Sequence, residues 1–316
     1  MPLKTSRSSI GAWFFVLFVS CSNTSRQQKI IGDYEWRDFL YYLQRPLPVT
    51  FRLTQNIGLR NSLEQCVKSS RRLLTEEDIY DEGNTIPAPF YMEWCNAWQL
   101  GCDRESLSRS EHPKLQKIYQ WLLKYSNLGT IIRQETVSML PVAFLQVEPH
   151  HKVLDLCAAP GSKTTQVMDA IFANGEENVS GFVIANDADP RRSYMLVRRC
   201  AVLSNACQHL MITCHKAQVF PDVHHDPSNP TMERPRGGGF DRIVCDVPCC
   251  GDGTLRKSRA LFYRWHPFFG IGLHSLQLQI AMRGISLLNE GGVMVYSTCT
   301  FNPIENEAVV AALLEK

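Results

Sequence analysis

After Pro149, short apolar runs alternate with longer segments whose apolar residues recur at helical spacing. The expected strands cover 153–157, 181–187, 209–213, 240–246 and 292–296, and the expected helices cover 163–173, 191–203 and 274–288. Such alternation is typical of parallel sheets with helices on both faces. The pattern therefore predicts an α/β fold with a mainly parallel, doubly wound sheet. A last helix is expected from Asn302 as its N-cap, because Pro303 suits the first helical position.

The residues before Pro149 follow a less regular pattern. Residues 112–126 carry apolar side chains at the spacing of an amphipathic helix. An apolar run at 11–19 behind Lys4 and Arg7 resembles a signal peptide, but it is too short for a membrane-spanning helix. We predict that residues 1–28 are either a signal-like segment or a wrongly assigned start of the protein sequence. Residues 29–111 are predicted to form an accessory RNA-binding region, and residues 112–316 the main domain.

Composition and charge exclude few classes of protein. The 316 residues are 44% apolar, which is enough for a sizeable core. A net charge of +2 gives a weak overall field, so nucleic-acid binding would depend on local basic clusters. The 12 cysteines are scattered along a long α/β chain rather than densely spaced, which favours a reducing compartment.

Two of these cysteines follow expected strands. Cys249 comes after the strand 240–246, and Cys299 comes after the strand 292–296. The carboxyl ends of parallel strands share one edge of a sheet, with neighbouring strands about 4.8 Å apart. The two thiols and Asp246 could therefore meet over one crevice. The alternative is that each cysteine is a small apolar side chain with no chemical role.

A loop of small residues joins the first expected strand of the main domain to its helix. Its sequence is Cys157-Ala158-Ala159-Pro160-Gly161-Ser162-Lys163. Small residues at such a position let a ligand approach backbone amides at the amino end of the helix. A P-loop would need Gly directly before the Lys, so ATP hydrolysis is not expected. The alternative is a plain turn between strand and helix.

Asp187 ends the second expected strand of the main domain. A carboxylate there can accept hydrogen bonds from the ribose hydroxyls of an adenosine ligand. Strand-end acids are also common as helix caps, and Asp189 is near enough in the sequence to share or take either role.

Several motifs together resemble the Nop/Sun family of RNA cytosine-5 methyltransferases, and most closely its eukaryotic tRNA-modifying branch. The resemblance runs from about Glu35 to Lys316 and includes segments 47–48, 132–139, 155–166, 245–249, 251–254 and 296–300. It implies a Rossmann-like fold that binds S-adenosylmethionine and methylates carbon 5 of cytosine in RNA, with tRNA as the expected substrate.

The resemblance also implies a role for each candidate site residue. Cys299 is the nucleophile at carbon 6 of cytosine, because carbon 5 needs covalent activation before it can accept a methyl group. Cys249 helps to remove the proton on carbon 5, Asp246 binds the cytosine edge, and Lys163 supports the same site. The cofactor is expected to contact residues 157–163, Asp187 and Asp246.

Two positions depart from the family pattern. Cys250 replaces the usual Ser after the Pro-Cys pair, so Cys245, Cys249 and Cys250 lie in one short segment. A zinc site there would lack a second closely spaced pair of ligands, and no metal is predicted. Lys216 stands where the family has an acid for the adenine amino group, which would weaken cofactor binding by about 1 to 3 kcal/mol in a dry site. Asp222 could substitute for that acid.

Local clusters of basic and aromatic residues could attract RNA. The basic clusters are Arg191-Arg192, Arg198-Arg199 and Arg256-Lys257 with Arg259, and the candidate stacking residues are Tyr263 and Trp265. Alternatively, each basic cluster is an ordinary solvated surface.

The chain ends at Lys316 inside the last expected helix, which leads us to expect a truncated carboxyl end. The alternative function is therefore a non-catalytic RNA-binding relative that keeps the fold. We expect the protein in the nucleus, with the nucleolus included, or in the cytoplasm, and we expect no membrane association of the mature chain. The sequence leaves the oligomeric state open.

Overall fold

The computed structural model describes residues 31–316 except 55–59, 75–76, 82–83, 174–178, 223–237, 258–260, 262–264 and 267. The chain divides into two compact units. The larger unit contains residues 48–246 and 280–296, and the smaller contains the residues up to Leu47 together with 247–279 and 297–316. The predicted N-terminal segment 1–28 lies outside the described residues, so this prediction and the predicted domain boundaries stay predictions.

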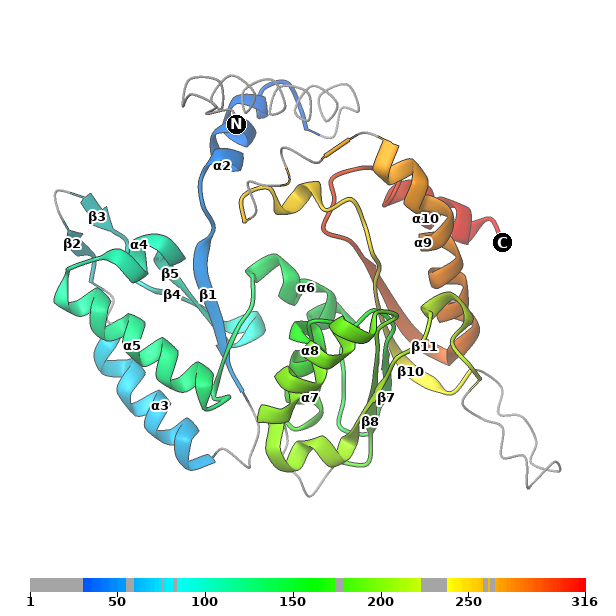
Figure 1. Cartoon of the computed structure of the whole chain (residues 1–316), viewed down its shortest axis with the longest axis horizontal. Coiled ribbons are helices and arrows are strands. Elements are labelled where there is room, and N and C mark those ends of the chain that lie inside the picture. The colour runs from blue at the N-terminus through cyan, green and yellow to red at the C-terminus, as the bar shows by residue number, and fades with distance from the viewer. Residues whose placement is uncertain are drawn as a thin grey trace, which may run out of the picture. The chain divides into compact units, whose positions relative to one another are not determined.

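A five-stranded sheet forms the centre of the larger unit (Figure 1), in the order β11-β10-β7-β8-β9. Its strands are β7 (Lys152–Asp155), β8 (Phe182–Asn186), β9 (Leu210–Thr213), β10 (Phe240–Asp246) and β11 (Leu288–Ser297). The pairs β10–β7, β7–β8 and β8–β9 are parallel. Gly238 N donates to Leu288 O and Val247 N donates to Ser297 O, both at 3.1 Å, so β11 runs in the same direction as β10. The predicted parallel sheet is confirmed.

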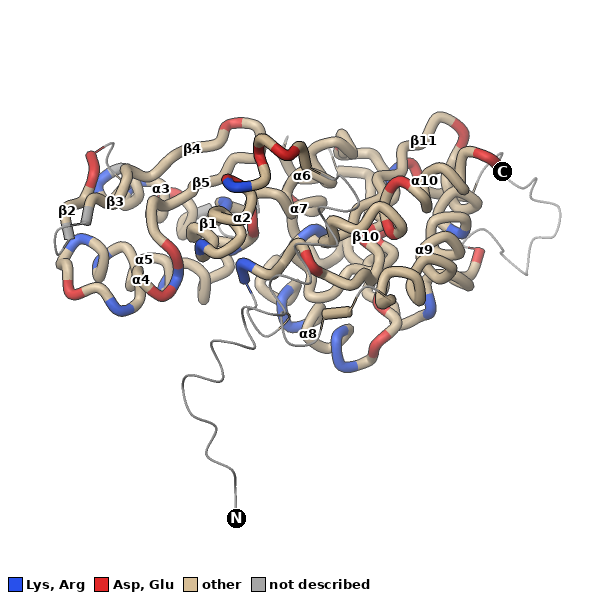
Figure 2. The backbone as a smooth tube through the Cα atoms, turned by 90° about the horizontal axis from the view of Figure 1, so that it is seen from above, with Lys and Arg blue, Asp and Glu red and all other residues tan. Residues whose placement is uncertain are grey.

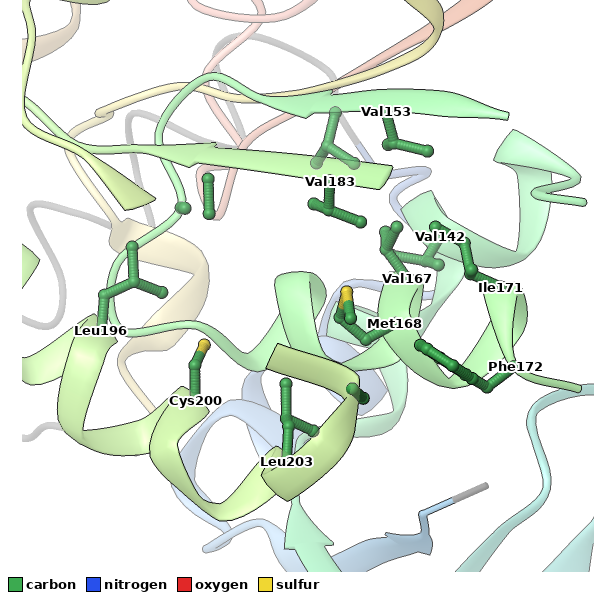
Figure 3. Close-up of a cluster of buried hydrophobic side chains, with 14 of the residues drawn as sticks. Val142, Val153, Val167, Met168, Ile171, Phe172, Val183, Leu196, Cys200 and Leu203 are labelled. Atoms are coloured by element: carbon green, nitrogen blue, oxygen red, sulfur yellow. The ribbon is translucent and has the colours of Figure 1, made fainter. Parts of the chain in front are cut away.

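The core of this sheet fixes the helices that follow β7 and β8. Helices α6 (Thr136–Leu145), α7 (Ser162–Ile171) and α8 (Pro190–Cys200) contribute apolar side chains to one buried cluster. Figure 3 shows Val153 and Val183 of the sheet facing this cluster, which includes Val167 of α7 and Leu196 of α8. Burial of these side chains stabilises the packing by roughly 1.5 to 3 kcal/mol each. The short connections from β7 to α7 and from β8 to α8 are thereby held at one edge of the sheet.

A second, antiparallel sheet lies in the amino-terminal part of the larger unit, in the order β4-β5-β1-β6. Its core contains Phe51 of β1 and Leu122 of α5. The elements of this part are β1 (Pro48–Leu53), α3 (Arg60–Leu73), the hairpin of β2 (Ile79–Asp81) and β3 (Asn84–Ile86), β4 (Phe90–Met92), η2 (Glu93–Cys95), β5 (Ala97–Asp103), α4 (Arg104–Arg109), α5 (Pro113–Asn127) and β6 (Ile131–Arg133).

Arg52 of β1 connects this antiparallel sheet to helix α7 through a fully buried guanidinium group. It forms an ion pair with Asp169 on α7, donates from Nε to Gln134 Oε1 at 2.9 Å, and donates from Nη2 to Thr165 Oγ1 at 2.7 Å. Thr54 Oγ1 donates to Asp169 Oδ1 at 2.7 Å. A buried charge needs such partners, because desolvation otherwise penalises it heavily.

Replacing Arg52 by Met is expected to lower the free energy of unfolding by about 3 to 5 kcal/mol, because it leaves the Asp169 carboxylate buried without its partner. Chemical denaturation measures this difference. Arg109→Ala is the control, since Arg109 pairs with Glu105 on an exposed helix surface and should contribute below about 1 kcal/mol. Equal midpoints for the two variants would contradict the expectation.

The smaller unit contains helix α2 (Trp36–Gln44), the first part of α9 (Phe268–Leu287), the turn η6 (Asp252–Thr254) and helix α10 (Glu307–Leu314). Leu43 of α2 and Leu255 are buried against Phe39, Trp265 and Phe301. The cluster packs segments that are far apart in the sequence around the residues that follow β10 and β11.

The largest differences from the sequence prediction lie at element ends. The last helix begins at Glu307, because Asn302 and Glu305 instead form a turn in which Glu305 N donates to Asn302 O at 3.0 Å. Helix α8 ends at Cys200, and the 3-10 helix η4 (Ala201–His209) follows it. In the predicted loop 218–239, the 3-10 helix η5 (Ala217–Val219) covers the start, and residues 223–237 lie outside the described residues.

None of the described helices has both the length and the apolar character needed to cross a membrane.

Candidate active site

The small-residue loop after β7 is held against the neighbouring strand. Ala158 N donates to Asn186 O at 2.7 Å, at the end of β8, and Gly161 N donates to Ala158 O at 2.7 Å. Gly161 is the N-cap of α7 and has a φ of 102°, which favours glycine. A Cβ at this position would lie 2.8 Å from Leu196 Cδ1, so the tight packing of the loop on α8 also requires glycine.

Asp187 is buried immediately after β8 and is tied to the same loop. Its Oδ2 accepts from Ala159 N at 3.1 Å and lies 3.3 Å from Nη2 of Arg192, and its Oδ1 accepts from Asp189 N at 3.1 Å. Arg192 also donates to Ala159 O at 2.6 Å. The carboxylate therefore fixes the loop and still has lone pairs at the sheet edge for further donors.

Asp189 has a different task from Asp187. Its Oδ1 accepts from Arg191 N at 2.7 Å and from Arg192 N at 3.3 Å, so Asp189 caps α8. A pocket of about 490 Å³ opens beside this cap and is lined by residues 188–191. Of the two acids considered from the sequence, Asp187 is therefore the one bonded to the small-residue loop.

Lys163 and Asp246 form an ion pair at the carboxyl edge of the sheet. Lys163 Nζ lies 2.7 Å from Asp246 Oδ2 and donates to Ser138 Oγ at 3.2 Å. Lys163 lies in the first turn of α7 and Asp246 ends β10, and their side chains are 14% and 32% exposed. The family resemblance implied that Lys163 and Asp246 serve the same site, and the structure brings these two side chains together. Ser138 was not identified from the sequence, since its contact with Lys163 depends on tertiary packing.

Asp155 lies at the end of β7 and is fully buried. Its Oδ2 accepts from Thr164 Oγ1 at 2.8 Å, whereas its Oδ1 has no hydrogen-bond partner within the described part of the chain. Burial is the main cause that raises the pKa of this carboxyl group to about 7, and the nearby charge of Asp246 contributes to that rise. An unpartnered acceptor beside the small-residue loop is a group that a bound ligand could satisfy.

In the smaller unit, the two strand-end cysteines face each other. Cys249 Sγ and Cys299 Sγ are 3.3 Å apart, and Cys299 N also donates to Cys249 Sγ at 3.3 Å. Cys249 is half-buried and Cys299 is exposed. The prediction that these two thiols converge is confirmed by this geometry.

The two thiols differ in their surroundings. The hydrogen bond between the sulfurs and burial raise the pKa of Cys249. Cys299 is the exposed member of the pair. An exposed thiol beside a second thiol is suited to nucleophilic attack followed by proton transfer.

The backbone of the loop after Cys249 is bonded to the segment around Cys299. Gly253 N donates to Cys299 O at 3.0 Å, and Asp252 Oδ1 accepts from Phe301 N at 2.7 Å. Asp252 is buried, and its burial raises the pKa of its carboxyl group. These contacts hold the two cysteine-bearing loops side by side.

The other cysteines of the predicted cluster are held separately. Cys245 is buried in β10, and burial raises its pKa, as it does for Cys157 in the small-residue loop. Cys250 Sγ lies 3.0 Å from Thr300 Oγ1, and burial raises its pKa to about 12. These three thiols are therefore poor nucleophiles at neutral pH.

The predicted RNA-binding residues do not all remain available. Arg191 and Arg198 are exposed on α8, and Figure 2 allows the basic and acidic positions to be followed along the backbone. Arg199 instead donates to Arg133 O at 2.9 Å, and Arg256 donates to Arg45 O at 2.9 Å. The expectation that Trp265 stacks a base is not supported, because Trp265 packs in the apolar cluster with Leu43 and Leu255. Arg259 and Tyr263 lie outside the described residues.

Lys216, which stands where the family has an acid, gains no substitute carboxylate from Asp222. Lys216 is exposed three residues after the end of β9. Asp222, which could have replaced the missing acid, is exposed and forms an ion pair with Arg283 at 2.8 Å. Its carboxylate is therefore already engaged at the surface.

The parallel sheet, the small-residue loop after β7 and the acid after β8 define a Rossmann-like methyltransferase fold. Residues 142–316 match the model of the family described as 16S rRNA methyltransferase RsmB/F, and the chain belongs to this family. The resemblance found in the sequence is thereby confirmed.

Curated relatives and solved structures agree with this assignment. The chain is 44% identical over 288 residues to the multisite-specific tRNA:(cytosine-C(5))-methyltransferase of Saccharomyces cerevisiae, covering 89% of this chain and 40% of the relative. It is 38% identical over 202 residues to the tRNA (cytosine(49)-C(5))-methyltransferase of Pyrococcus abyssi, covering 63% and 57%. The first three curated relatives are spanned over only 39 to 43% of their length.

The fold is shared with solved proteins of Pyrococcus horikoshii. One is described as a methyltransferase homolog protein, with a TM-score of 0.58, 22% identity, and coverage of 91% of this chain and 76% of that one. Another is NSun6 in a crystal structure with SFG, with a TM-score of 0.60, 16% identity, and coverage of 93% and 86%. At these identities the likeness shows the fold alone.

Proposed function

We propose that the protein transfers a methyl group from S-adenosylmethionine to carbon 5 of cytosine in RNA, and that its substrate is tRNA. The observation that carries this proposal is the thiol pair, in which the sulfur of half-buried Cys249 lies 3.3 Å from the sulfur of exposed Cys299. Cytosine carbon 5 is a weak nucleophile, so a protein that methylates it needs one group to attack the ring and another to manage its protons.

The larger unit offers residues that fit the cofactor. Its carboxylate Asp187 suits ribose hydroxyls, and the loop 157–163 presents small residues and the amino end of α7. The unpartnered Oδ1 of Asp155 suits a cationic group such as an amino acid ammonium. When bound, S-adenosylmethionine supplies an electrophilic methyl group on a sulfonium. Exposed Lys216 provides no acceptor for an adenine amino group, so we expect that contact to be missing.

The thiols would act in sequence on the cytosine ring. Exposed Cys299, as a thiolate, would form a bond from sulfur to carbon 6, which makes carbon 5 nucleophilic. Asp246, held by Lys163, is the group that would hydrogen-bond the cytosine edge and steady the charge that develops there.

Cys249 would manage the proton on carbon 5. Its sulfur lies 3.3 Å from that of Cys299, so it is close to a ring bonded to Cys299. Once carbon 5 carries the methyl group, Cys249, having lost its own proton to solvent, would accept the proton from carbon 5. Departure of Cys299 from carbon 6 completes the cycle with the electron pair returning to sulfur.

Several observations support RNA as the substrate. Curated relatives that share 38 to 44% of the aligned residues are named tRNA cytosine methyltransferases. The exposed Arg191 and Arg198 on α8 are available for phosphate contacts. Attack on carbon 6 requires access to a ring face, so the target cytosine would be unstacked or flipped out. Location in the nucleus or cytoplasm stays a prediction.

Replacing Asp187 by Asn is expected to weaken S-adenosylmethionine binding about tenfold or more, because it removes a buried carboxylate that bonds the loop and would bond ribose. Calorimetric titration of the purified protein measures the change. Asp189→Asn is the matched control, since Asn caps a helix as well as Asp. No binding by folded wild-type protein would instead favour the non-catalytic RNA-binding relative, and equal loss in both variants would contradict the assignment of Asp187.

A further inference from the structure

Glu305 is a fully buried acid in the turn between the Cys299 loop and helix α10. Its Oε1 accepts from Cys250 N at 2.9 Å and from Gln277 Nε2 at 2.9 Å. Its Oε2 accepts from Thr300 Oγ1 at 3.2 Å. A buried carboxylate that receives donors on both oxygens is a fixed anchor, because every alternative position would leave polar groups unsatisfied.

The partners of Glu305 are the immediate neighbours of the two thiols. Cys250 follows Cys249 in the chain, and Thr300 follows Cys299. Gln277 of α9 donates also to Pro248 O at 2.9 Å, so it holds the residue that precedes Cys249. One carboxylate is thus connected to the Cys249 loop on one side and to the Cys299 loop on the other.

The packing of α9 shows that this arrangement is built into the local sequence. A Cβ at Gly270 of α9 would lie 2.1 Å from Asn302 Nδ2 and 2.9 Å from Glu305 Oε2. A larger residue at position 270 would therefore displace the side chains of Asn302 and Glu305. The donor to Glu305 on the same helix, Gln277, is two helical turns further along α9.

Other bonds also join the two loops. Cys299 N donates to Cys249 Sγ, Cys250 Sγ lies 3.0 Å from Thr300 Oγ1, and two bonds beyond Cys250 join Gly253 to Cys299 and Asp252 to Phe301. The contacts of Glu305 and Gln277 differ from these in that they hold the backbone of Cys250 and Pro248, which flank Cys249.

We propose that Glu305 is a positioning residue that sets the separation of the Cys249 and Cys299 sulfurs by holding both loops through one carboxylate. The proposed function uses this thiol pair, and the biological meaning of the positioning by Glu305 rests on that function. Glu305 acts on the two sulfurs through Cys250 and Thr300.

The separation of the sulfurs can be measured without cofactor or RNA. In a glutathione buffer, the two thiols transfer two electrons and two protons to glutathione disulfide, which yields one intramolecular disulfide and two molecules of glutathione. The equilibrium constant of this exchange gives the effective concentration of one thiol at the other. After alkylation and digestion, mass spectrometry quantifies the linked peptides, and fragmentation assigns Cys249 rather than the adjacent Cys250.

Glu305→Ala is expected to lower the effective thiol concentration about tenfold or more, because three donors lose their acceptor. Glu305→Gln should remain close to wild type, since its amide oxygen can serve Cys250 and Gln277 while its amide nitrogen donates to Thr300. Glu307→Ala is the matched control, as Glu307 is an exposed acid in the next turn. A near-normal thiol concentration in Glu305→Gln would show that the hydrogen bonds of residue 305 matter and that its negative charge does not.

An unchanged equilibrium in folded Glu305→Ala protein would overturn the proposal. If that variant does not fold, Thr300→Val removes the same hydroxyl contact with little change of shape, and it should lower the effective concentration about threefold. An unchanged value in Thr300→Val would then count against the proposal. Because the exchange involves neither methyl transfer nor RNA, failure of the proposed function would leave its result unaffected.

Discussion

Replacement of Cys299 by Ala is expected to reduce methylation of RNA roughly a thousandfold or more, because no other group in the site can attack carbon 6 of cytosine. Cys299 is exposed, whereas Cys249 is half-buried, and the hydrogen bond between the sulfurs and burial raise its pKa. Cys249 is therefore less suited to take over the attack. The rate of methyl incorporation into tRNA under saturating S-adenosylmethionine measures the loss.

The control for this variant is Cys95→Ser. Cys95 lies in the 3-10 helix η2 next to the antiparallel sheet and has no part in the proposed mechanism. It should retain wild-type activity, which would show that loss of a thiol alone has no effect. A Cys299→Ala protein that is folded and still methylates RNA at the rate of the control would contradict the nucleophile assignment.

Replacement of Cys249 by Ala should have a different result, namely accumulation of protein covalently linked to RNA. The attack by Cys299 remains possible, but the proton on carbon 5 is no longer removed, so the sulfur cannot leave carbon 6. Denaturing gel electrophoresis with labelled tRNA and S-adenosylmethionine measures the adduct. We expect turnover to fall by roughly a hundredfold or more as the adduct forms, as is usual for loss of a general base.

The combined variant lacking both thiols distinguishes the two roles. It should form no adduct, because the bond to RNA requires Cys299. Adduct formation by Cys299→Ala alone, or equal turnover in the two single variants, would show that the roles of the thiols are assigned wrongly.

The sequence predicts the candidate site at the carboxyl edge of the sheet better than it predicts the contacts between distant segments. Short apolar runs identify the strands, and the rule that parallel strands end at one edge places Cys249 near Cys299 before any coordinates are known. The small-residue loop and Asp187 follow from the same reasoning, and the structure joins them through the bond from Ala159 N.

Contacts that depend on distant segments cannot be read from such patterns. Glu305 looks like an ordinary acid in the first turn of a helix, yet the turn bends toward α9 and the carboxylate becomes buried. Trp265 looks like an available stacking residue, yet it completes an apolar cluster with α2. Arg52 lies in a short strand whose pattern gives no reason to expect an ion pair with Asp169 on α7. In each case the tertiary partner decides the environment.

The most direct test of the central claim is the fate of a labelled methyl group. Purified protein is incubated with unmodified tRNA and S-adenosylmethionine that carries an isotope-labelled methyl group, and the RNA is digested to nucleosides for mass spectrometry. The account predicts labelled 5-methylcytidine that is absent when Cys299→Ala protein is used. Absence of labelled 5-methylcytidine with folded wild-type protein that binds the cofactor, or equal labelling by the Cys299 variant, would contradict it.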